Sequence, residues 1–267
     1  MSTQTQAGYN RYVNMAESRG PLAAKFATQI IETCRPFVTK PPGEWDVLDI
    51  GCGYAHTVAE LARNCRSAVG IEPTADLYAE AAALATNLSL PTLGVRRQGI
   101  YELTEVGQYD LVVLDNVFEH LPKQAEALDV ISQVLRPGGA AFLLMPNKLW
   151  PIEVHYRLPF LSYLPLGLAN RYLRASGRGT DYADASYAPT YFRLRRLLRK
   201  HPEFRFHFVL PAIPSATMAG SPLHYRAGMA ILRRIPLMWV ISKAFLVVVQ
   251  KTAAGPLAAA DPGLPRP

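Results

Sequence analysis

The sequence has few cysteines and no long hydrophobic run, and both absences limit what the protein can be. Cys34, Cys52 and Cys65 show neither CxxC spacing nor a histidine partner pattern, so neither a disulfide framework nor a zinc site is expected. The first residues lack a basic segment followed by an apolar one, so no secretory signal is expected. Residues 235–250, the most apolar late segment, include Ser242 and Lys243 and fall short of the roughly 20 residues that span a bilayer. A cytoplasmic protein is predicted, with a buried helix and then a strand in residues 235–250.

Acidic residues are fewer than basic residues. There are 21 of them against 28 Lys and Arg, a formal net charge of +7. Such a charge suits nucleic acid, an anionic membrane or a phosphorylated substrate. Much of it lies in residues 171–205, and Arg193, Arg195, Arg196 and Arg199 are most simply read as a solvated helix face, with a phosphate or an anionic membrane as the alternative. The composition, 49% hydrophobic and 18% charged, is that of one ordinary globular domain.

The middle of the chain alternates between strand-like and helix-like segments. Helices are predicted at residues 55–64, 75–88, 124–135 and 190–200, and Pro137, Gly138 and Gly139 are expected to turn the chain from a helix into the next strand. Strands are predicted at residues 46–50, 68–72, 93–98, 109–115, 140–145, 204–210 and 245–251. Strands that are apolar on both faces are typical of a parallel sheet covered by helices on each side. The pattern predicts an α/β fold with a doubly wound, mostly parallel seven-stranded sheet.

Four regions are expected from these patterns. Residues 1–44 are predicted to form an N-terminal helical cap, and residues 45–252 the main domain. Residues 147–188, which are aromatic and interrupted by prolines, are predicted to be an insertion that acts as a substrate lid. Residues 253–267, rich in Ala, Pro and Gly, are predicted to be a disordered tail.

The stretch VLDIGCGYA, residues 47–55, places an acid and two glycines at the end of the first predicted strand. Ligands of an open parallel sheet bind outside the carboxyl ends of the strands, and glycines let a ligand approach the backbone there. A dinucleotide site would show GxGxxG, but His56 occupies the third glycine position. Asp49 would repel a pyrophosphate and suits a ligand with an ammonium or sulfonium charge. The turn therefore predicts a small-ligand site and argues against NAD.

Four segments in order extend this pattern: VLDIGCGYA, VGIEP at residues 69–73, QYDLVVLDNVFEHLP at residues 108–122 and LRPGGAAFLLMPN at residues 135–147. Together they resemble the class I S-adenosylmethionine-dependent methyltransferases. The resemblance implies a Rossmann-like methyltransferase fold with S-adenosylmethionine as the cofactor. One departure is Ala55, which stands where many members have a further glycine.

The resemblance also implies which residues bind the cofactor, all of them just inside or after predicted strands. They are Asp49, Gly51, Cys52 and Gly53 at the methionine part, Glu72 at both ribose hydroxyls, Gln98, Gly99 and Ile100 at the adenine, and Asp115, Asn116 and Val117 at the methionine end and the transferred methyl. A carboxylate such as that of Glu72 is chemically suited to two hydroxyls, because it accepts two hydrogen bonds at once.

The segment NVFEHLP raises the question of a metal. It resembles the ubiquinone-pathway O-methyltransferases, in which an ExxEH arrangement is associated with a divalent cation. Asn116 stands here in place of the first acid, and Glu119 and His120 remain. Two ligands make a poor site for a hard cation. No required metal is therefore predicted, and His120 is expected to be a structural hydrogen-bonding group or to face the substrate.

Methyl transfer to a hydroxyl needs a base, and His155 and His120 are the candidates. His155, in WPIEVHYRLPF, titrates near neutral pH when unperturbed; the alternative is a loop histidine bonded to backbone. Tyr12 of an N-terminal helix is expected to face the substrate with Trp150, Glu153 and Tyr156 of the insertion.

The expected activity is S-adenosylmethionine-dependent methylation of a small molecule at oxygen, on a nucleotide- or lipid-linked sugar or a natural-product hydroxyl. No nucleic-acid substrate is expected, because DNVF replaces the Asn/Asp-Pro-Pro-aromatic clamp of enzymes that methylate base amino groups. The other hypothesis is a non-catalytic, cofactor-binding scaffold of a membrane-associated assembly. Peripheral membrane contact, and a monomer or a homodimer, stay open at this stage.

Overall fold

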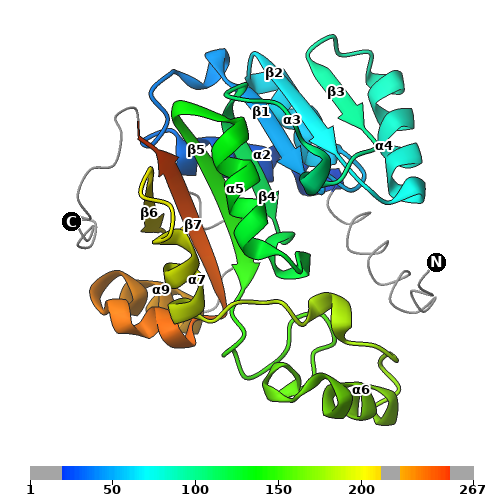
Figure 1. Ribbon diagram of the computed structural model, residues 1–267, viewed down its shortest axis with the longest axis vertical. Coiled ribbons are helices and arrows are strands. Elements are labelled where there is room, and N and C mark those ends of the chain that lie inside the picture. Colours follow the sequence, from blue (N-terminus) through cyan, green and yellow to red (C-terminus); the bar gives the residue numbers. More distant parts are fainter. Residues whose placement is uncertain (1–19, 212–222, 253–267) are drawn as a thin grey trace.

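The structure is a computed structural model that describes residues 20–211 and 223–252. A seven-stranded sheet crosses these residues in the order β3-β2-β1-β4-β5-β7-β6 (Figure 1). β1 to β5 pair in parallel, and β7 runs antiparallel to both neighbours, β5 and β6. The strands are β1 (Asp46–Ile50), β2 (Ser67–Ile71), β3 (Leu93–Arg96), β4 (Tyr109–Asp115), β5 (Leu135–Pro146), β6 (Phe204–Phe208) and β7 (Ala244–Lys251). The predicted doubly wound, mostly parallel seven-stranded sheet is confirmed.

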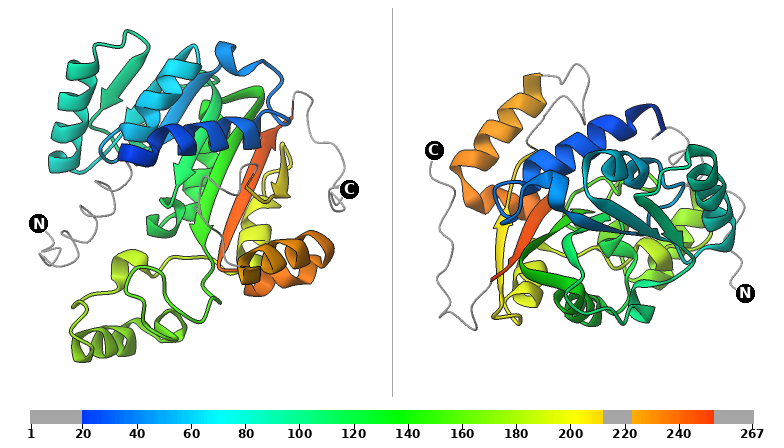
Figure 2. Two further views of the ribbon diagram at one scale, coloured as in Figure 1. Left: turned by 180° about the vertical axis from the view of Figure 1, so that it is seen from behind. Right: turned by 90° about the horizontal axis from the view of Figure 1, so that it is seen from above.

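Helices cover both faces of the sheet. α2 (Ala23–Cys34), α3 (His56–Asn64) and α4 (Ala75–Leu88) pack on one face, and α5 (Gln124–Val134) and α7 (Tyr191–Leu198) pack on the other, as the front and back views show (Figures 1 and 2). α6 (Leu166–Ala175) and α9 (Leu223–Arg234) lie outside these layers. The short 3-10 helices are η1 (Gly20–Leu22), η2 (Pro42–Glu44), η3 (Ile100–Glu102), η4 (Phe118–His120), η5 (Leu161–Tyr163), η6 (Ala183–Ala185) and η7 (Pro236–Ile241).

Each face of the sheet has its own hydrophobic core, because successive side chains along a strand point to opposite faces. Val47 and Leu111 pack with α2 and α3, whereas their neighbours Leu48 and Val112 pack with α5 and α7. All of these side chains are fully buried. Strands that are apolar on both faces are thus explained by helices on both faces.

Two sequence-based expectations need correction. Pro137, Gly138 and Gly139 lie within β5, because α5 ends at Val134 and β5 begins at Leu135 and takes a register shift against β4. The helix expected to be buried before β7 is the 3-10 helix η7, in which Leu237 is 70% exposed, and the side chain of Trp239 is buried. Trp239 and, in part, Val240 pack against the core, whereas Leu237 and Ile241 are exposed.

The segment between β5 and α7 packs around a small core of its own at the carboxyl end of the parallel strands (Figure 1). This core is formed by Leu158, Leu161, Ala169, Leu173, Tyr182 and Ala185. The segment corresponds to the predicted insertion, and its action as a lid stays a prediction. The predicted N-terminal cap lies in part outside the described residues; its described helix, α2, packs on the sheet beside α3. The predicted tail lies outside them as well.

Within residues 20–211 and 223–252, none of the helices combines the length and the apolar character needed to cross a membrane.

Candidate active site

The turn between β1 and α3 has an unusual backbone. Gly51, Gly53 and Ala55 have φ values of +71°, +55° and 62°, in the left-handed region that favours glycine. The amide groups of Gly51 and Cys52 donate to the carbonyl oxygen of Ile71 at the end of β2, at 2.9 and 3.1 Å. A β-carbon on Gly51 would lie 2.7 Å from a methyl group of Val117. The turn after β1 and the segment after β4 are therefore in contact, as expected for two parts of one site.

Glu72 follows β2 and joins it to the same turn. Its side chain is buried, with 3% of the residue exposed. One carboxylate oxygen accepts the Gly53 amide at 3.1 Å and the other accepts the Thr74 amide at 2.9 Å. A carboxylate has about four lone-pair positions, so about two remain for a ligand. Both backbone bonds hold the carboxylate in one orientation beside the glycine turn.

Asp49 and Cys52 lie at the base of this turn. Asp49 is 5% exposed and pairs with Gly70 of β2 and Val113 of β4, in the middle of the sheet. Burial raises the pKa of the Cys52 thiol, and the negative charges of Asp49 and Glu72 raise it further. The thiol therefore stays protonated near neutral pH and is a poor nucleophile.

The predicted adenine residues lie in the loop after β3. Because β3 ends at Arg96, Gln98 is in the loop and not in the strand that the sequence predicts. The Gln98 side chain donates to the Glu102 carbonyl oxygen, and the Gly99 amide donates to the Glu102 carboxylate, both at 2.9 Å. Ile100 is 4% exposed and packs in the core. Glu102 thus holds the loop, and the contact with adenine stays a prediction.

The chain turns sharply at the end of β4. Asp115 is the last residue of β4, and Asn116 has a φ of 55°, which asparagine tolerates better than most residues. The Asn116 side chain donates to the Asp115 carboxylate at 2.6 Å, and its amide donates to the Leu144 carbonyl oxygen at 2.8 Å. This turn carries Val117 onto Gly51 and continues directly into η4.

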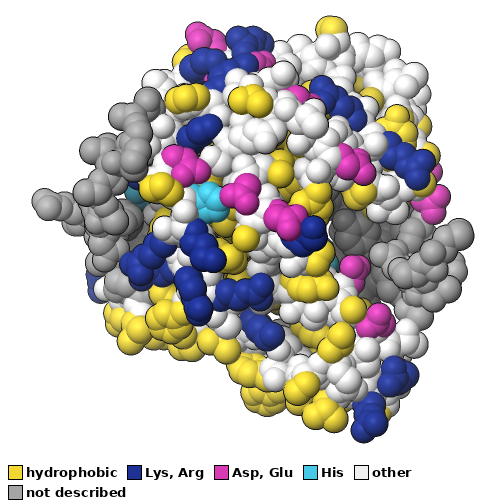
Figure 3. All heavy atoms as spheres, in the orientation of Figure 1, with side chains coloured by type: hydrophobic (Ala, Val, Ile, Leu, Met, Phe, Trp, Pro, Cys, Tyr) yellow, Lys and Arg dark blue, Asp and Glu magenta, His cyan; other side chains and the backbone are white. Residues whose placement is uncertain are grey.

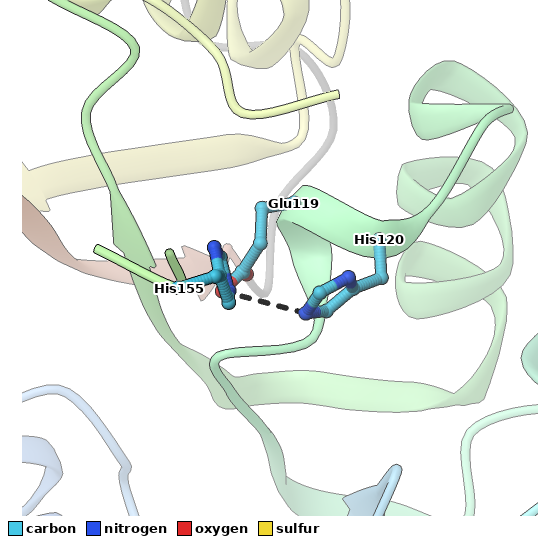
Figure 4. Close-up of side chains that lie close together, drawn as sticks. All are labelled: Glu119, His120 and His155. Atoms are coloured by element: carbon cyan, nitrogen blue, oxygen red, sulfur yellow. Dashed lines mark ion pairs between the residues drawn. The ribbon is translucent and has the colours of Figure 1, made fainter. Parts of the chain in front are cut away.

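η4 and the insertion bring three polar side chains together, Glu119, His120 and His155 (Figure 4). Nε2 of each imidazole lies 4.0 Å from the same carboxylate oxygen of Glu119. The Glu119 side chain is fully buried, whereas those of His120 and His155 are 27% and 23% exposed. The cluster therefore presents two imidazoles to the outside above a buried carboxylate. We call it the Glu–His–His cluster.

The other nitrogen of each imidazole has a fixed partner. Nδ1 of His120 lies 3.0 Å from the Asp184 carbonyl oxygen, and Nδ1 of His155 lies 2.6 Å from the Glu153 carboxylate. Carbonyl and carboxylate oxygens only accept, so both Nδ1 atoms carry the hydrogen. In the neutral form of each ring the lone pair is then on Nε2, facing Glu119.

The two imidazoles differ in their affinity for a proton. Burial, and then the charge of the neighbouring His155, lower the pKa of His120 below its ordinary value. Burial alone would lower the pKa of His155, but the hydrogen bond and charge of Glu153, together with Glu119, raise it above its ordinary value. The cluster thus pairs an imidazole that stays neutral with one that binds a proton more readily.

The remaining predicted substrate residues are partly engaged within the insertion. Trp150 is half-buried. The Glu153 carboxylate is 5% exposed and accepts both His155 Nδ1–H and the Tyr156 amide. The Tyr156 hydroxyl donates to the Asp181 carbonyl oxygen at 3.0 Å. Glu153 is therefore placed to orient His155, and Tyr12 lies outside the described residues.

The sequence points to Glu119 beside His120 but does not join them to His155, and it does not single out Asp184. Glu119 was visible as the neighbour of His120 in NVFEHLP, but nothing in the sequence joins it to His155. Asp184 contributes through its backbone carbonyl, which any residue type would supply. No sequence signal exists for such a contact.

Comparison with known proteins fits this geometry. The methyltransferase domain family matches residues 18–195, more than half of the chain. The chain therefore belongs to the methyltransferase domain family.

Curated relatives match over part of their length. An uncharacterized methyltransferase of Mycobacterium sp. (strain JLS) is 30% identical over 173 residues, which cover 63% of this chain and 66% of the relative. A ubiquinone biosynthesis O-methyltransferase of Psychrobacter cryohalolentis is 31% identical over 108 residues, 38% of this chain and 41% of the relative. The matches thus span less than two thirds of these relatives.

Solved structures share the fold. The plantazolicin methyltransferase BpumL, in complex with a triazolic desmethylPZN analog and SAH, superposes with a TM-score of 0.59 at 14% sequence identity, covering 91% of this chain and 90% of the other. At this identity the likeness shows the Rossmann-like methyltransferase fold.

S-adenosylmethionine is the cofactor that the family and the fold indicate, and the site residues fit it. Gly51 and Gly53 have no side chain to block the approach of a ligand to their backbone, and the Cys52 side chain between them lies against Gly70 of β2. The buried Glu72 carboxylate has lone pairs that could accept from a diol. The acidic pair Asp49 and Glu72 suits a sulfonium charge better than a pyrophosphate.

Proposed function

We propose that this chain transfers the methyl group of S-adenosylmethionine to a hydroxyl group of a small molecule. The observation that carries the proposal is the Glu–His–His cluster at the carboxyl end of β4, a few residues beyond the contact between Val117 and Gly51. A hydroxyl gives up its proton when it is methylated, and each partly exposed imidazole of the cluster keeps an Nε2 lone pair because its Nδ1 carries the hydrogen.

In the proposed reaction the acceptor oxygen attacks the methyl carbon in line with the sulfonium leaving group. The oxygen–carbon bond forms, the carbon–sulfur bond breaks with its electron pair going to sulfur, and S-adenosylhomocysteine leaves. The hydroxyl proton passes to Nε2 of His155, whose cationic form Glu153 stabilises through Nδ1–H. The buried Glu119 carboxylate lies 4.0 Å from Nε2, the other ring nitrogen. The chain otherwise contributes positioning and exclusion of water.

Oxygen as the acceptor atom is supported by the relatives named ubiquinone biosynthesis O-methyltransferases. A sugar hydroxyl, nucleotide- or lipid-linked, and a natural-product hydroxyl are the acceptor classes. The insertion suits either, because it carries exposed aromatic side chains, among them Phe160 and Tyr163 at 59% and 45% exposed. A cytoplasmic location and a biosynthetic role stay predictions.

A peripheral contact with an anionic membrane is part of the proposal and favours a lipid-linked acceptor. Lys and Arg side chains gather on one face in the region of α7, above hydrophobic side chains along the lower edge (Figure 3). We call this surface the basic–apolar patch; its exposed members are Arg193, Arg196, Arg199, Lys200, Phe192, Ile231, Ile235, Leu237 and Ile241. Cations beside exposed apolar side chains are the combination that binds anionic lipid surfaces.

The cofactor half of the proposal is tested by calorimetric titration with S-adenosylmethionine, S-adenosylhomocysteine and, as a control, NAD. Binding of the first two and no binding of NAD are expected. Acceptors are then screened by release of S-adenosylhomocysteine. Failure of both cofactor ligands to bind would contradict the proposal, whereas cofactor binding without turnover of any acceptor would favour the non-catalytic scaffold.

The membrane contact is tested by sedimentation with vesicles that contain phosphatidylserine. Binding should fade as salt rises, and Arg193→Glu with Arg196→Glu should weaken it. The matched control reverses two exposed cations on the opposite face, Lys25→Glu and Arg63→Glu. Equal binding by both double variants would contradict a contact through the basic–apolar patch.

A further inference from the structure

We propose that Glu119, His120 and His155 form a site for one divalent ion of the zinc type. One ligand atom from each residue lies within 4.8 Å of the other two. Two ligands about 2.1 Å from one ion lie at most about 4.2 Å apart. Both Nε2 atoms are 4.0 Å from the Glu119 oxygen, inside that limit, and a small rotation of the rings closes the third pair.

The contacts behind the cluster are those of metal-binding imidazoles. A metal-ligating histidine almost always donates its second ring N–H to a carboxylate or a backbone carbonyl, which fixes the tautomer and the ring orientation. His155 makes the first kind of contact, through Glu153 at 2.6 Å, and His120 makes the second, through Asp184 at 3.0 Å. Both rings are therefore oriented with Nε2 toward the same buried carboxylate before any ion arrives.

The ligand set selects the class of ion. Two imidazole nitrogens and one carboxylate suit zinc and neighbouring transition metals, whereas magnesium and calcium prefer oxygen ligands. Three protein ligands are one fewer than closed structural zinc sites use, so positions for an outside ligand remain. Because His120 and His155 are partly exposed, that outside ligand would reach the ion from their side.

The segment NVFEHLP by itself offers two ligands, Glu119 and His120, and for that reason the sequence predicts no required metal. His155 is the third ligand, and it comes from the insertion between β5 and α7. The ion would thus join η4 to the insertion, in addition to the Asp184 contact. Its role in catalysis rests on the proposed function: a bound ion would hold the acceptor hydroxyl and lower the pKa of that hydroxyl so that its proton passes to water, while His155 serves as a ligand and no longer as the base.

The test is direct titration of untagged, chelator-treated protein with Zn²⁺ by calorimetry and with Co²⁺ by visible absorption. One ion per chain is expected, with little response to Mg²⁺. Glu119→Gln and His155→Asn should each weaken Zn²⁺ binding at least about tenfold, and Glu153→Gln should weaken it about 10- to 100-fold by releasing the His155 ring. The matched control is His207→Gln, a histidine on β6 that is outside the cluster.

Circular dichroism of each variant separates loss of the site from loss of the fold. Zn²⁺ binding that is unchanged in Glu119→Gln and His155→Asn, or that His207→Gln removes equally, would overturn the proposal. Absence of binding in folded wild-type protein would overturn it as well. Because no acceptor or cofactor is present, these results do not depend on methyl transfer, and a failed activity screen would leave the metal site standing.

Discussion

Glu72 and His155 are proposed to act on the cofactor and on the acceptor, and they lie in different parts of the chain. The Glu72 carboxylate is held by the Gly53 and Thr74 amides, next to the turn that the cofactor would approach. His155 is held by Glu153 within the insertion, on the acceptor side. Changes at the two residues should therefore affect different measured quantities.

Removal of the Glu72 carboxylate should weaken cofactor binding. We expect Glu72→Ala to cost about 1.5–3 kcal/mol, the range for hydrogen bonds to a charged group, and Glu72→Gln to fall between this variant and wild type because one oxygen remains. Calorimetric titration with S-adenosylhomocysteine measures both. An unchanged dissociation constant in Glu72→Ala would refute the ribose role.

Removal of the His155 imidazole should slow turnover and leave cofactor affinity unchanged. We expect His155→Gln to lower kcat about 10²- to 10⁴-fold, the usual contribution of a positioned acid or base, with the same affinity for S-adenosylhomocysteine. Single-turnover methyl transfer to an accepted substrate measures the effect. A kcat within a factor of about two of wild type would show that His155 takes no part in the reaction.

At the scale of elements, the sequence predicts best where burial on both faces and helix periodicity are strong. β1, β4 and α4 begin and end where their sequences predict, and α7 with its C-cap exposes Arg193, Arg196 and Arg199 of the predicted solvated face. The sequence predicts element boundaries least well where pairing between strands overrides the turn preference of the local residues. β5 runs through the Pro-Gly-Gly stretch because β4 pairs with it on both sides of the register shift. α9 was not predicted.

The start of α7 offers a test of local helix stabilisation. Thr190 is the N-cap residue, and its hydroxyl accepts the Arg193 amide at 3.2 Å. We expect Thr190→Ala to lower the free energy of unfolding by about 1 kcal/mol, the usual cost of a lost N-cap. Thr190→Ser keeps the hydroxyl and serves as the control. Equal urea midpoints for the two variants would show that the cap contributes nothing here.

At the scale of the whole molecule, the cofactor side of the site could be anticipated and the acceptor side could not. Asp49, Gly51 and Glu72 lie at the ends of adjacent strands, so sheet topology alone brings them together. The Glu–His–His cluster depends on how the insertion folds back onto η4. Its contacts join residues far apart in the sequence and use backbone carbonyls, which no pattern of residue types encodes.

A charge network at the amino ends of β1 and β4 makes the stability of the whole protein depend on pH. Arg136 contacts Asp46 at 2.9 Å and the buried Asp110 at 2.6 Å, and Arg66 also pairs with Asp46. The hydrogen bond from Arg66, with help from Ser67 and Arg136, holds the pKa of Asp46 below its ordinary value. Because the unfolded state binds this proton first, the stabilisation is present above about pH 4 and fades as pH falls toward the folded pKa.

We therefore expect Asp46→Asn to be less stable than wild type at neutral pH, with a difference that shrinks below about pH 4. Urea unfolding across this pH range measures it. Cofactor affinity should be unchanged at neutral pH, since the network lies at the end of the strands opposite the site. A stability difference that is constant with pH would contradict the ionic origin.

The buried side-chain amide of Asn147 connects the start of the insertion to the segment before β7. Asn147 follows β5, is 3% exposed, and donates from its side chain to the carbonyl oxygens of Val240 and Ser242 at 2.9 and 2.8 Å. Its side-chain oxygen accepts the Leu149 amide at 3.0 Å. The first residues of the insertion and the segment from η7 to β7 thus share an anchor, and we expect them to unfold locally together. We therefore expect a membrane surface that holds η7 in place to slow hydrogen exchange at the first residues of the insertion as well.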